Sequence, residues 1–243
     1  MSPSQKTRIL VVDDHPMVRH GLVRLISQQK DLLCCGEAST ADEARAAIAK
    51  LKPDLVILDL RLQRGDGLEL IKSLKCLHPN LRILILTQYD APLYAERALR
   101  AGALGYLVKE QAANEILNAI RTVLSGQVYL TPALAGLMLH KLVGATGKLS
   151  RTGVEQLTDR ELHVLQLLGA GLSTRHIAMH LKLSFKTIET HRENIKSKLG
   201  LRGAAQLVHF ANEWARRQGT LPPQPPSQIS SKGSSYPTIS RPP

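Results

Sequence analysis

Ile9-Leu10-Val11-Val12-Asp13-Asp14 and Leu55-Val56-Ile57-Leu58-Asp59 are the two stretches that decide the fold of this chain. Each begins as a continuous run of branched apolar residues, which is the pattern of a parallel strand buried on both faces. Each run ends in aspartate, and open α/β sheets carry their functional groups at the carboxyl ends of such strands. A single aspartate in this position also fits a turn residue or a helix cap. Three of them together predict an acidic pocket at one edge of a sheet.

Two further strand ends add a hydroxyl and an ammonium group to that edge. The apolar run 81–86 ends in Thr87, and the run 103–108 ends in Lys109. Because crowded carboxylates repel one another, we expect the three aspartates to hold a hard divalent cation, Mg2+ above all. The set predicts a phosphoryl-transfer site in which Asp59 attacks while Lys109 and Thr87 face the phosphate oxygens.

Helical patterns lie between the apolar runs. Pro16 suits the first position of a helix that extends to residue 29, and Thr40 opens a second helix with a capping box. Further amphipathic segments cover residues 67–77, 92–101 and 112–124. This alternation predicts a flavodoxin-like, doubly wound α/β fold with five parallel strands and five helices. A strand near Leu32 would bury Cys34 and Cys35 as free thiols.

Residues 7–125 resemble a response-regulator receiver domain, and the chain as a whole resembles the NarL/FixJ (LuxR-type helix-turn-helix) response regulators. The resemblance implies that Asp59 is the phosphorylated aspartate, that Asp13 and Asp14 organise Mg2+, and that Thr87 and Lys109 contact the phosphoryl group. It also implies that Tyr106 turns inward on phosphorylation. One departure is that the family's usual proline in the loop after the acceptor is absent from Asp59-Leu60-Arg61-Leu62-Gln63-Arg64, which leaves this loop less restrained.

Composition and charge divide the 243 residues unevenly. Residues 1–125 carry 17 basic and 14 acidic side chains, whereas residues 126–243 carry 15 and 6, so the net charge of +12 is concentrated in the carboxyl half. Such an excess favours nucleic acid as a partner. We expect a linker over 126–155 with a short helix at 134–143, a helical domain over 156–218, and a disordered tail over 219–243 rich in proline and serine.

The helical domain has the pattern of a helix-turn-helix. Thr158 begins a capping box, and Ser173 and Ser184 cap two further helices that are joined by a tight turn at Lys182. The spelling Leu157-Thr158-x-Arg160-Glu161, followed by Ser184-x-x-Thr187-Ile188-x-x-His191-x-x-Asn194-Ile195-x-x-Lys198-Leu199-Gly200, resembles the LuxR-type DNA-binding domain. The resemblance implies that the helix after Ser184 enters the major groove.

Helical periodicity divides that helix into two sides. Phe185, Ile188, Ile195 and Leu199 fall in one apolar sector that should face the core. We expect Glu189, Thr190 and Glu193 to read bases and the basic residues to contact phosphates. The DNA-contacting candidates are therefore Lys186, Thr187, Glu189, Thr190, Arg192, Glu193, Lys196 and Lys198. The family precedent also implies a dimer contact through Leu207, Val208 and Ala211, whereas their helical spacing alone favours packing in the core of the domain. A homodimer would match a two-fold symmetric operator.

The expected protein is a two-component response regulator, phosphorylated by a sensor histidine kinase, that binds a double-stranded DNA operator, with RNA polymerase as a further partner. It would be no enzyme beyond its own phosphoryl transfer. The absence of a signal pattern and of an apolar stretch of about 18 residues predicts a cytoplasmic protein without a membrane span. Two alternatives are a phosphorylation-independent DNA-binding regulator and a haloacid-dehalogenase-like hydrolase, although the latter needs a second aspartate where this chain has Arg61.

Overall fold

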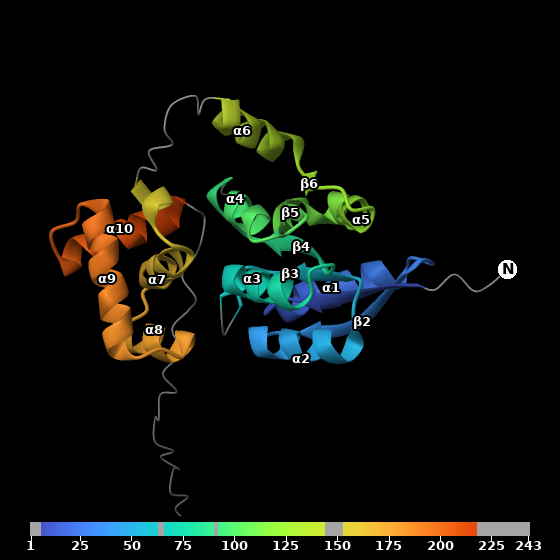
Figure 1. Ribbon diagram of the computed structural model, residues 1–243, viewed down its shortest axis with the longest axis horizontal. Helices are drawn as coiled ribbons and strands as arrows, with labels where there is room; N and C mark the ends of the chain where they lie inside the picture. Colours follow the sequence, from blue (N-terminus) through green and yellow to red (C-terminus); the bar gives the residue numbers. More distant parts are fainter. Residues whose placement is uncertain (1–5, 63–65, 90–91, 144–152, 218–243) are drawn as a thin grey trace, which may run out of the picture.

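The computed structural model describes residues 6–62, 66–89, 92–143 and 153–217 of the chain (Figure 1). Its first part is a parallel sheet with the strand order β2-β1-β3-β4-β5-β6. The strands are β1 (Thr7–Val12), β2 (Leu32–Ala38), β3 (Leu55–Leu58), β4 (Arg82–Thr87), β5 (Gly105–Val108) and β6 (Tyr129–Leu130). The predicted doubly wound α/β fold is confirmed, with six strands instead of five. The sixth escaped prediction because two residues are too few to show a periodicity.

Helices cover both faces of the sheet, and alternate residues of each strand point to different helices. Ile9 and Val11 pack with α1 (Pro16–Ser27) and α5 (Ala112–Leu124). Leu10 and Val12 instead join the core beneath α2 (Ala41–Leu51), α3 (Gly67–Leu77) and α4 (Pro92–Arg100). Because every residue of β3 is buried on one face or the other, the continuous apolar run in the sequence has a direct structural cause.

The helices start where the sequence placed their signals. Pro16 is at the first position of α1, the Thr40 hydroxyl accepts the backbone N–H of Glu43, and Asp66 caps α3 by accepting the N–H groups of Leu68 and Glu69. Caps of this kind satisfy backbone donors that have no partner within the helix. They also determine where each strand-to-helix loop ends, and these loops surround the acidic edge of the sheet.

The predicted short helix before the helical domain is present as α6 (Pro132–Val143), which packs against α4. It follows β6 directly, so this part of the expected linker belongs to the same body as the sheet. Elements β1 to α6, together with the 3-10 turn η1 (Lys109–Gln111), form what we call the sheet domain. The expected disordered tail and residues 144–152 of the expected linker lie outside the described residues.

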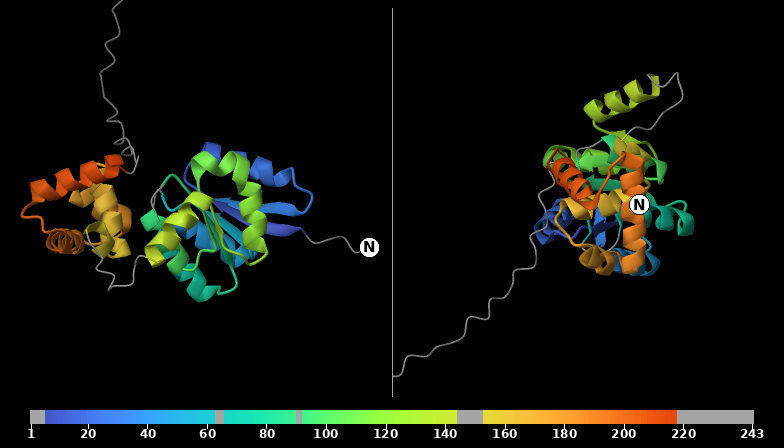
Figure 2. Two further views of the ribbon diagram at one scale, coloured as in Figure 1. Left: turned by 90° about the horizontal axis from the view of Figure 1, so that it is seen from above. Right: turned by 90° about the vertical axis from the view of Figure 1, so that its left-hand side faces the viewer.

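A helical domain stands beside the sheet domain (Figures 1 and 2). It comprises η2 (Gly153–Gln156), α7 (Asp159–Gly169), α8 (Thr174–Leu181), α9 (Phe185–Leu199) and α10 (Ala204–Arg217). Thr158 and Glu161 make the complete capping box that the sequence predicts, and Ser173 and Ser184 cap α8 and α9. Lys182 ends α8 in the left-handed conformation, with φ 53°. This residue makes the tight turn of the predicted helix-turn-helix.

The cysteines are more exposed than expected. Cys34 and Cys35 are free and half-buried, so their predicted burial is only partly right, and Cys76 is exposed.

Within the described ranges, none of the helices combines the length and the apolar character that crossing a membrane requires.

Candidate functional site

The acidic pocket lies at the carboxyl ends of β1 and β3, two neighbouring strands inside the sheet. Oxygen atoms of Asp13, Asp14 and Asp59 and a ring nitrogen of His15 all lie within 4.8 Å of one another. Asp13 and Asp59 are 2% and 1% exposed. The strand order reverses between β1 and β3, which is where open α/β sheets form their crevice. The three carboxylates therefore meet as the sequence predicted.

Lys109 closes this pocket from the end of β5. Its ammonium nitrogen lies 2.6 Å from Asp13 Oδ2 and also 2.6 Å from Asp59 Oδ2. The other carboxylate oxygen of Asp59 accepts the backbone N–H of Arg61 at 3.0 Å. One buried cation thus joins two buried carboxylates, and the ammonium lies directly beside the candidate acceptor oxygen.

The electrostatics of the pocket reflect its crowding. Burial raises the pKa of Asp59, although the Lys109 ammonium opposes the change. Burial also raises the pKa of Asp14, which faces the Asp13 carboxylate as well. For Lys109, burial alone would lower the pKa, but the adjacent Asp59 and Asp13 carboxylates raise it on balance. Negative charge is therefore in excess here, and a cation with oxygen ligands would relieve it.

Thr87 and Tyr106 occupy the places expected of them, with one difference. Thr87 is completely buried, and its hydroxyl oxygen has no hydrogen-bond partner among the described residues, so it is available to a phosphoryl oxygen at this edge. Tyr106 is only 1% exposed, and its hydroxyl donates to the carbonyl oxygen of Tyr89 at 2.5 Å. The ring is already inside, so an inward turn cannot be the change that starts from this arrangement.

The predicted recognition helix, α9, lies on the side of the helical domain that faces away from the sheet domain (Figures 1 and 2). Ile188 and Ile195 are completely buried, as predicted. Phe185 is 57% exposed instead, because it is the first residue of α9 and lies beyond the edge of the core. The side chains of Lys186, Thr190 and Glu193 are exposed as expected. This face is open to a partner in the described arrangement.

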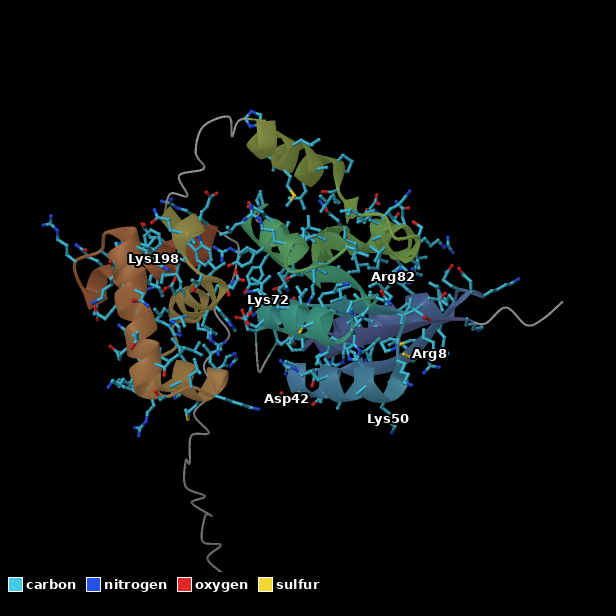
Figure 3. The ribbon with its side chains drawn as sticks, in the orientation of Figure 1. Arg8, Asp42, Lys50, Lys72, Arg82 and Lys198 are labelled. Atoms are coloured by element: carbon cyan, nitrogen blue, oxygen red, sulfur yellow. The ribbon has the colours of Figure 1, made fainter. Side chains whose placement is uncertain are left out.

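The basic residues of α9 do not all have free side chains. Arg192 donates to the hydroxyl of Thr174 and lies 3.4 Å from Glu189. Lys198, which is labelled in Figure 3, has its ammonium 2.6 Å from the buried carboxylate of Glu161, the capping-box residue of α7. Their predicted phosphate contacts therefore conflict with partners inside the domain, because periodicity shows the side of a helix but not the partner of a long side chain. Lys186 is exposed, and its phosphate contact stays a prediction.

Two more candidates of α9 are partly engaged. The Lys196 ammonium lies 2.8 Å from the exposed Glu193 one turn earlier on the same helix, and contact with a phosphate could replace this pair. The Thr187 hydroxyl lies 2.7 Å from the hydroxyl of Ser184 at the cap. His191 has a lowered pKa because of burial, so a neutral ring is favoured there. Lys196 and Thr187 stay predictions as DNA contacts.

The predicted dimer contact on α10 is wrong for two of its three residues. Leu207 and Ala211 are completely buried inside the helical domain. A Cβ added to Gly169 of α7 would lie 2.5 Å from the carbonyl oxygen of Ala211, so α7 and α10 approach too closely for any other residue at this position. The apolar spacing on α10 serves this packing. Val208, 39% exposed, stays a candidate for contact with a second copy.

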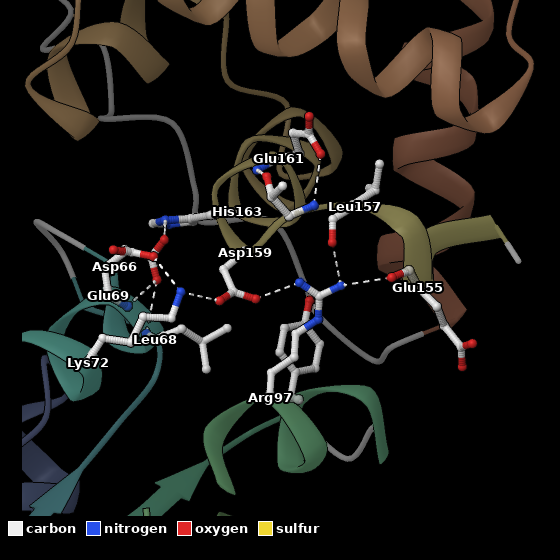
Figure 4. Close-up of polar contacts among 12 residues, drawn as sticks. Asp66, Leu68, Glu69, Lys72, Arg97, Glu155, Leu157, Asp159, Glu161 and His163 are labelled. Atoms are coloured by element: carbon white, nitrogen blue, oxygen red, sulfur yellow. Dashed lines mark hydrogen bonds and ion pairs between the residues drawn. The ribbon is translucent and has the colours of Figure 1, made fainter. Parts of the chain in front are cut away.

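The sequence did not predict the contact between the two domains (Figure 4). Asp159, at the start of α7, lies 2.6 Å from Arg97 of α4 and 2.6 Å from Lys72 of α3. Arg97 also donates to the carbonyl oxygen of Leu157 at 2.7 Å. His163 lies 3.1 Å from the carboxylate of Asp66. All these side chains look like ordinary solvated charges in the sequence, and only their opposite signs on two domains could have indicated a contact.

Comparison with known proteins adds two family matches. Residues 9–121 match the response regulator receiver domain, and residues 155–211 match the luxR family of bacterial regulatory proteins. Similar proteins include the DNA-binding transcriptional activator DevR/DosR of Mycobacterium tuberculosis, 37% identical over 86% of this chain and 95% of the relative. Response regulator protein VraR of Staphylococcus aureus is 34% identical over 84% of this chain and 95% of the relative.

Solved structures give the same picture. RcsB from Salmonella enterica serovar Typhimurium, bound to promoter P1flhDC in the presence of the phosphomimetic BeF3−, is similar with a TM-score of 0.65 and 25% identity, over 86% of this chain and 100% of that chain. A two-component response regulator of the LuxR family from Aurantimonas is similar with a TM-score of 0.54 and 34% identity, over 57% of this chain and 99% of that chain. The likeness extends across both domains.

Proposed function

Because this chain belongs to the response regulators that join a receiver domain to a LuxR-type DNA-binding domain, we propose that phosphorylation of Asp59 by a sensor histidine kinase controls its binding to DNA and hence transcription. The observation that carries this proposal is the position of Lys109, 2.6 Å from both Asp13 and Asp59 at the strand ends. We assign residues 7–125 to the receiver, 126–155 to the linker, 156–218 to the DNA-binding domain and 219–243 to a tail.

The geometry supports a direct phosphoryl transfer. A carboxylate oxygen of Asp59 attacks phosphorus in line, forming a P–O bond as the bond between phosphorus and the kinase histidine breaks. The Lys109 ammonium binds one phosphoryl oxygen, and the buried Thr87 hydroxyl donates to another. The residues suited to hold Mg2+ are Asp13, Asp14 and Asp59, since their oxygens converge, and the bound ion supplies charge neutralisation. Apart from this transfer to itself, the protein is no enzyme.

The DNA partner follows from the exposed side of α9. Placed in a major groove, this helix would present Glu189, Thr190 and Glu193 to base edges, while Lys186 and Lys196 meet phosphates. A homodimer with Val208 near its contact would read a two-fold symmetric operator. The solved RcsB structures include two RcsB dimers bound to two parallel DNAs, which supports this arrangement. The protein acts in the cytoplasm, where such DNA lies, and RNA polymerase is a further partner.

Selection of bound sites from random DNA, with and without acetyl phosphate and Mg2+, tests the proposal. We expect a two-fold symmetric motif whose affinity rises when Asp59 is loaded, and no such rise for Asp59→Asn. Asp54→Asn, at the opposite end of β3, is the matched control. Incorporation of phosphate into Asp59→Asn would overturn the assignment of the acceptor. Equal operator affinity in both conditions would favour a phosphorylation-independent regulator, and turnover of small phosphoesters would favour a hydrolase.

A further inference from the structure

A line of aromatic contacts leads from the acceptor pocket toward the DNA-binding domain. Tyr89 follows Thr87 by two positions, and its carbonyl oxygen accepts the hydroxyl of Tyr106 at 2.5 Å. The ring of Tyr89 stacks on Tyr94 of α4, with centroids 4.5 Å apart and 16° between the planes. These three tyrosines are between 1% and 7% exposed. Because closely packed rings have little free space around them, a shift of one requires a shift of the next.

Tyr94 makes two contacts with the DNA-binding domain. The side-chain amide of Gln166, on α7, donates to the Tyr94 hydroxyl. The ring of Trp214, on α10, lies 6.3 Å from the Tyr94 ring at an angle of 45°. Helix α7 packs directly against both α9 and α10. The single ring of Tyr94 thus joins the receiver to the two helices that support the recognition helix.

Ion pairs attach α4, and also α3, to the start of α7, at Asp159. Arg97 lies one helical turn after Tyr94, and it binds Asp159 and the carbonyl oxygen of Leu157. Lys72 of α3 binds the other carboxylate oxygen of Asp159 at 2.6 Å. The Arg97 side chain is largely buried, at 11% exposed, whereas Lys72 is exposed, at 47%. Residues one turn apart on a helix move together, so a displacement of α4 changes the aromatic and the ionic contacts at once.

The receiver does not cover the DNA-reading face in this arrangement, since α9 lies on the far side of its domain (Figure 2). Control by simple blockage of that face therefore has no structural basis here. Every contact described between the domains involves α7, the turn before it, the end of α8 or the end of α10. A signal from Asp59 has to pass through these contacts if the receiver is to change how the DNA-binding domain is held.

We propose that Tyr94 is the residue that couples the acceptor pocket to the DNA-binding domain, through its stacking on Tyr89 and its contacts with Gln166 and Trp214. This inference rests on the proposed phosphorylation of Asp59. The Thr87 hydroxyl has no hydrogen-bond partner among the described residues. When Thr87 moves to bind a phosphoryl oxygen, it displaces the short segment that joins it to Tyr89. By linkage, the domain contact and the phosphoryl group alter each other's free energy by the same amount.

Trp214 allows a direct test, because it is the only tryptophan of the chain. Tryptophan emission would be recorded in the full chain before and after loading with acetyl phosphate and Mg2+. Gel electrophoresis that separates phosphorylated protein would measure the loading independently. We expect the emission maximum or intensity to change in proportion to the loaded fraction, and to stay constant in Asp59→Asn. A change in either direction supports the coupling, whereas full loading with constant emission overturns it.

Substitutions at the contact between Tyr94 and Gln166 test whether the coupling passes through this contact. Tyr94→Phe removes only the hydroxyl that Gln166 contacts. The matched control is Tyr129→Phe, which removes a hydroxyl that donates to Glu115 at 2.6 Å and takes no part in the contact between the domains. We expect Tyr94→Phe and Gln166→Ala each to alter the phosphorylation-dependent change in operator affinity by about 2- to 10-fold, the range for one hydrogen bond. The double variant should show no further loss.

The outcomes separate the two proposals. If no phosphate is incorporated into the wild-type chain, the proposed function fails. If incorporation is normal but Tyr94→Phe and Tyr129→Phe respond alike, the coupling through Tyr94 is wrong and the function stands. Thermal unfolding of each variant shows whether it is folded, and Gln166→Ala repeats the test from the other side of the contact if Tyr94→Phe unfolds.

Discussion

The acceptor pocket and the DNA-reading face of α9 carry the two halves of the proposed function, and they are built in opposite ways. The pocket gathers buried and half-buried side chains from four strand ends, and each of them has its position set by the sheet. The candidate DNA contacts of α9 are exposed or half-buried side chains of one helix, and Arg192 and Lys198 have partners on other helices. A buried pocket leaves its side chains few arrangements, whereas an exposed helix leaves many.

This difference explains why the predictions for the two sites fared differently. The convergence of Asp13, Asp14, Asp59, Thr87 and Lys109 follows from strand order, which the sequence pattern determines. The roles of Arg192 and Lys198 depended on whether a long side chain turns toward DNA or toward its own domain. Substitutions in the pocket should therefore have large effects on stability. A substitution on α9 should change either DNA affinity or stability, but not both.

The largest expected effect is that of Lys109→Met. It leaves the buried carboxylates of Asp13 and Asp59 without their shared cation, and the free energy of unfolding should fall by about 3–5 kcal/mol. Urea unfolding followed by circular dichroism would measure it. Lys182→Met removes a cation that pairs with Asp42 on the surface, and we expect it to unfold like the wild type. Equal stability of the two variants would contradict the importance of the buried pair.

Addition of Mg2+ should have the next largest effect. Since a ligand that binds only the folded state stabilises it, a concentration 100 times the Kd raises the free energy of unfolding by about 2.7 kcal/mol. Thermal unfolding in Mg2+ and in EDTA would show this, and Asp14→Asn should reduce it. Asp54→Asn keeps the pocket intact and should respond fully. An unchanged Tm in Mg2+ would argue against the metal site.

Glu189→Ala tests the reading of bases by α9. We expect it to reduce discrimination among operator variants by about 1–3 kcal/mol at one base position. Lys186→Ala should instead weaken binding to all sequences alike and lower the salt dependence by about one phosphate contact. Titrations of labelled operators at several salt concentrations would separate these results. If Glu189→Ala instead weakened binding to all sequences alike and Lys186→Ala changed discrimination at one base position, α9 would lie in the groove with another side facing the bases.

The smallest effect belongs to Lys198→Ala, which removes the ion pair with Glu161. The loss should be about 1 kcal/mol or less, because solvent screens an ammonium that is one-third exposed. Burial alone would raise the pKa of Glu161, but Lys198 and the Thr158 N–H hold it below its usual range. This stabilisation is therefore present above the usual glutamate pKa and is lost as the pH falls through the lower folded value.

Unfolding of the wild type and of Lys198→Ala between neutral and acidic pH would measure that loss. The two stability curves should differ at neutral pH and converge in acid, while the salt dependence of DNA binding stays the same in both. A reduced salt dependence in Lys198→Ala would show that Lys198 contacts a phosphate after all, and the comparison between the two sites would then need revision.

Several structural features were beyond what the sequence could show. Strand β6 is too short for a periodic pattern, and the apolar spacing of Leu207 and Ala211 fits a core as well as a dimer contact. Trp214 is far from Tyr89 and Tyr94 in the sequence, and in a chain with 3% aromatic residues these rings offered no pattern that predicts their contact. Their contact depends on where α4 and α10 come to lie.

The sequence by itself determined the sheet domain, its acceptor pocket and the helix-turn-helix, because apolar periodicity, helix caps and residues at strand ends are local properties of the chain. Only the tertiary structure decided which cations of α9 are free, which face of α10 is buried and how the receiver meets α7. These features depend on pairs of side chains that are distant in sequence, and the choice among alternative partners is made only when the domains pack together.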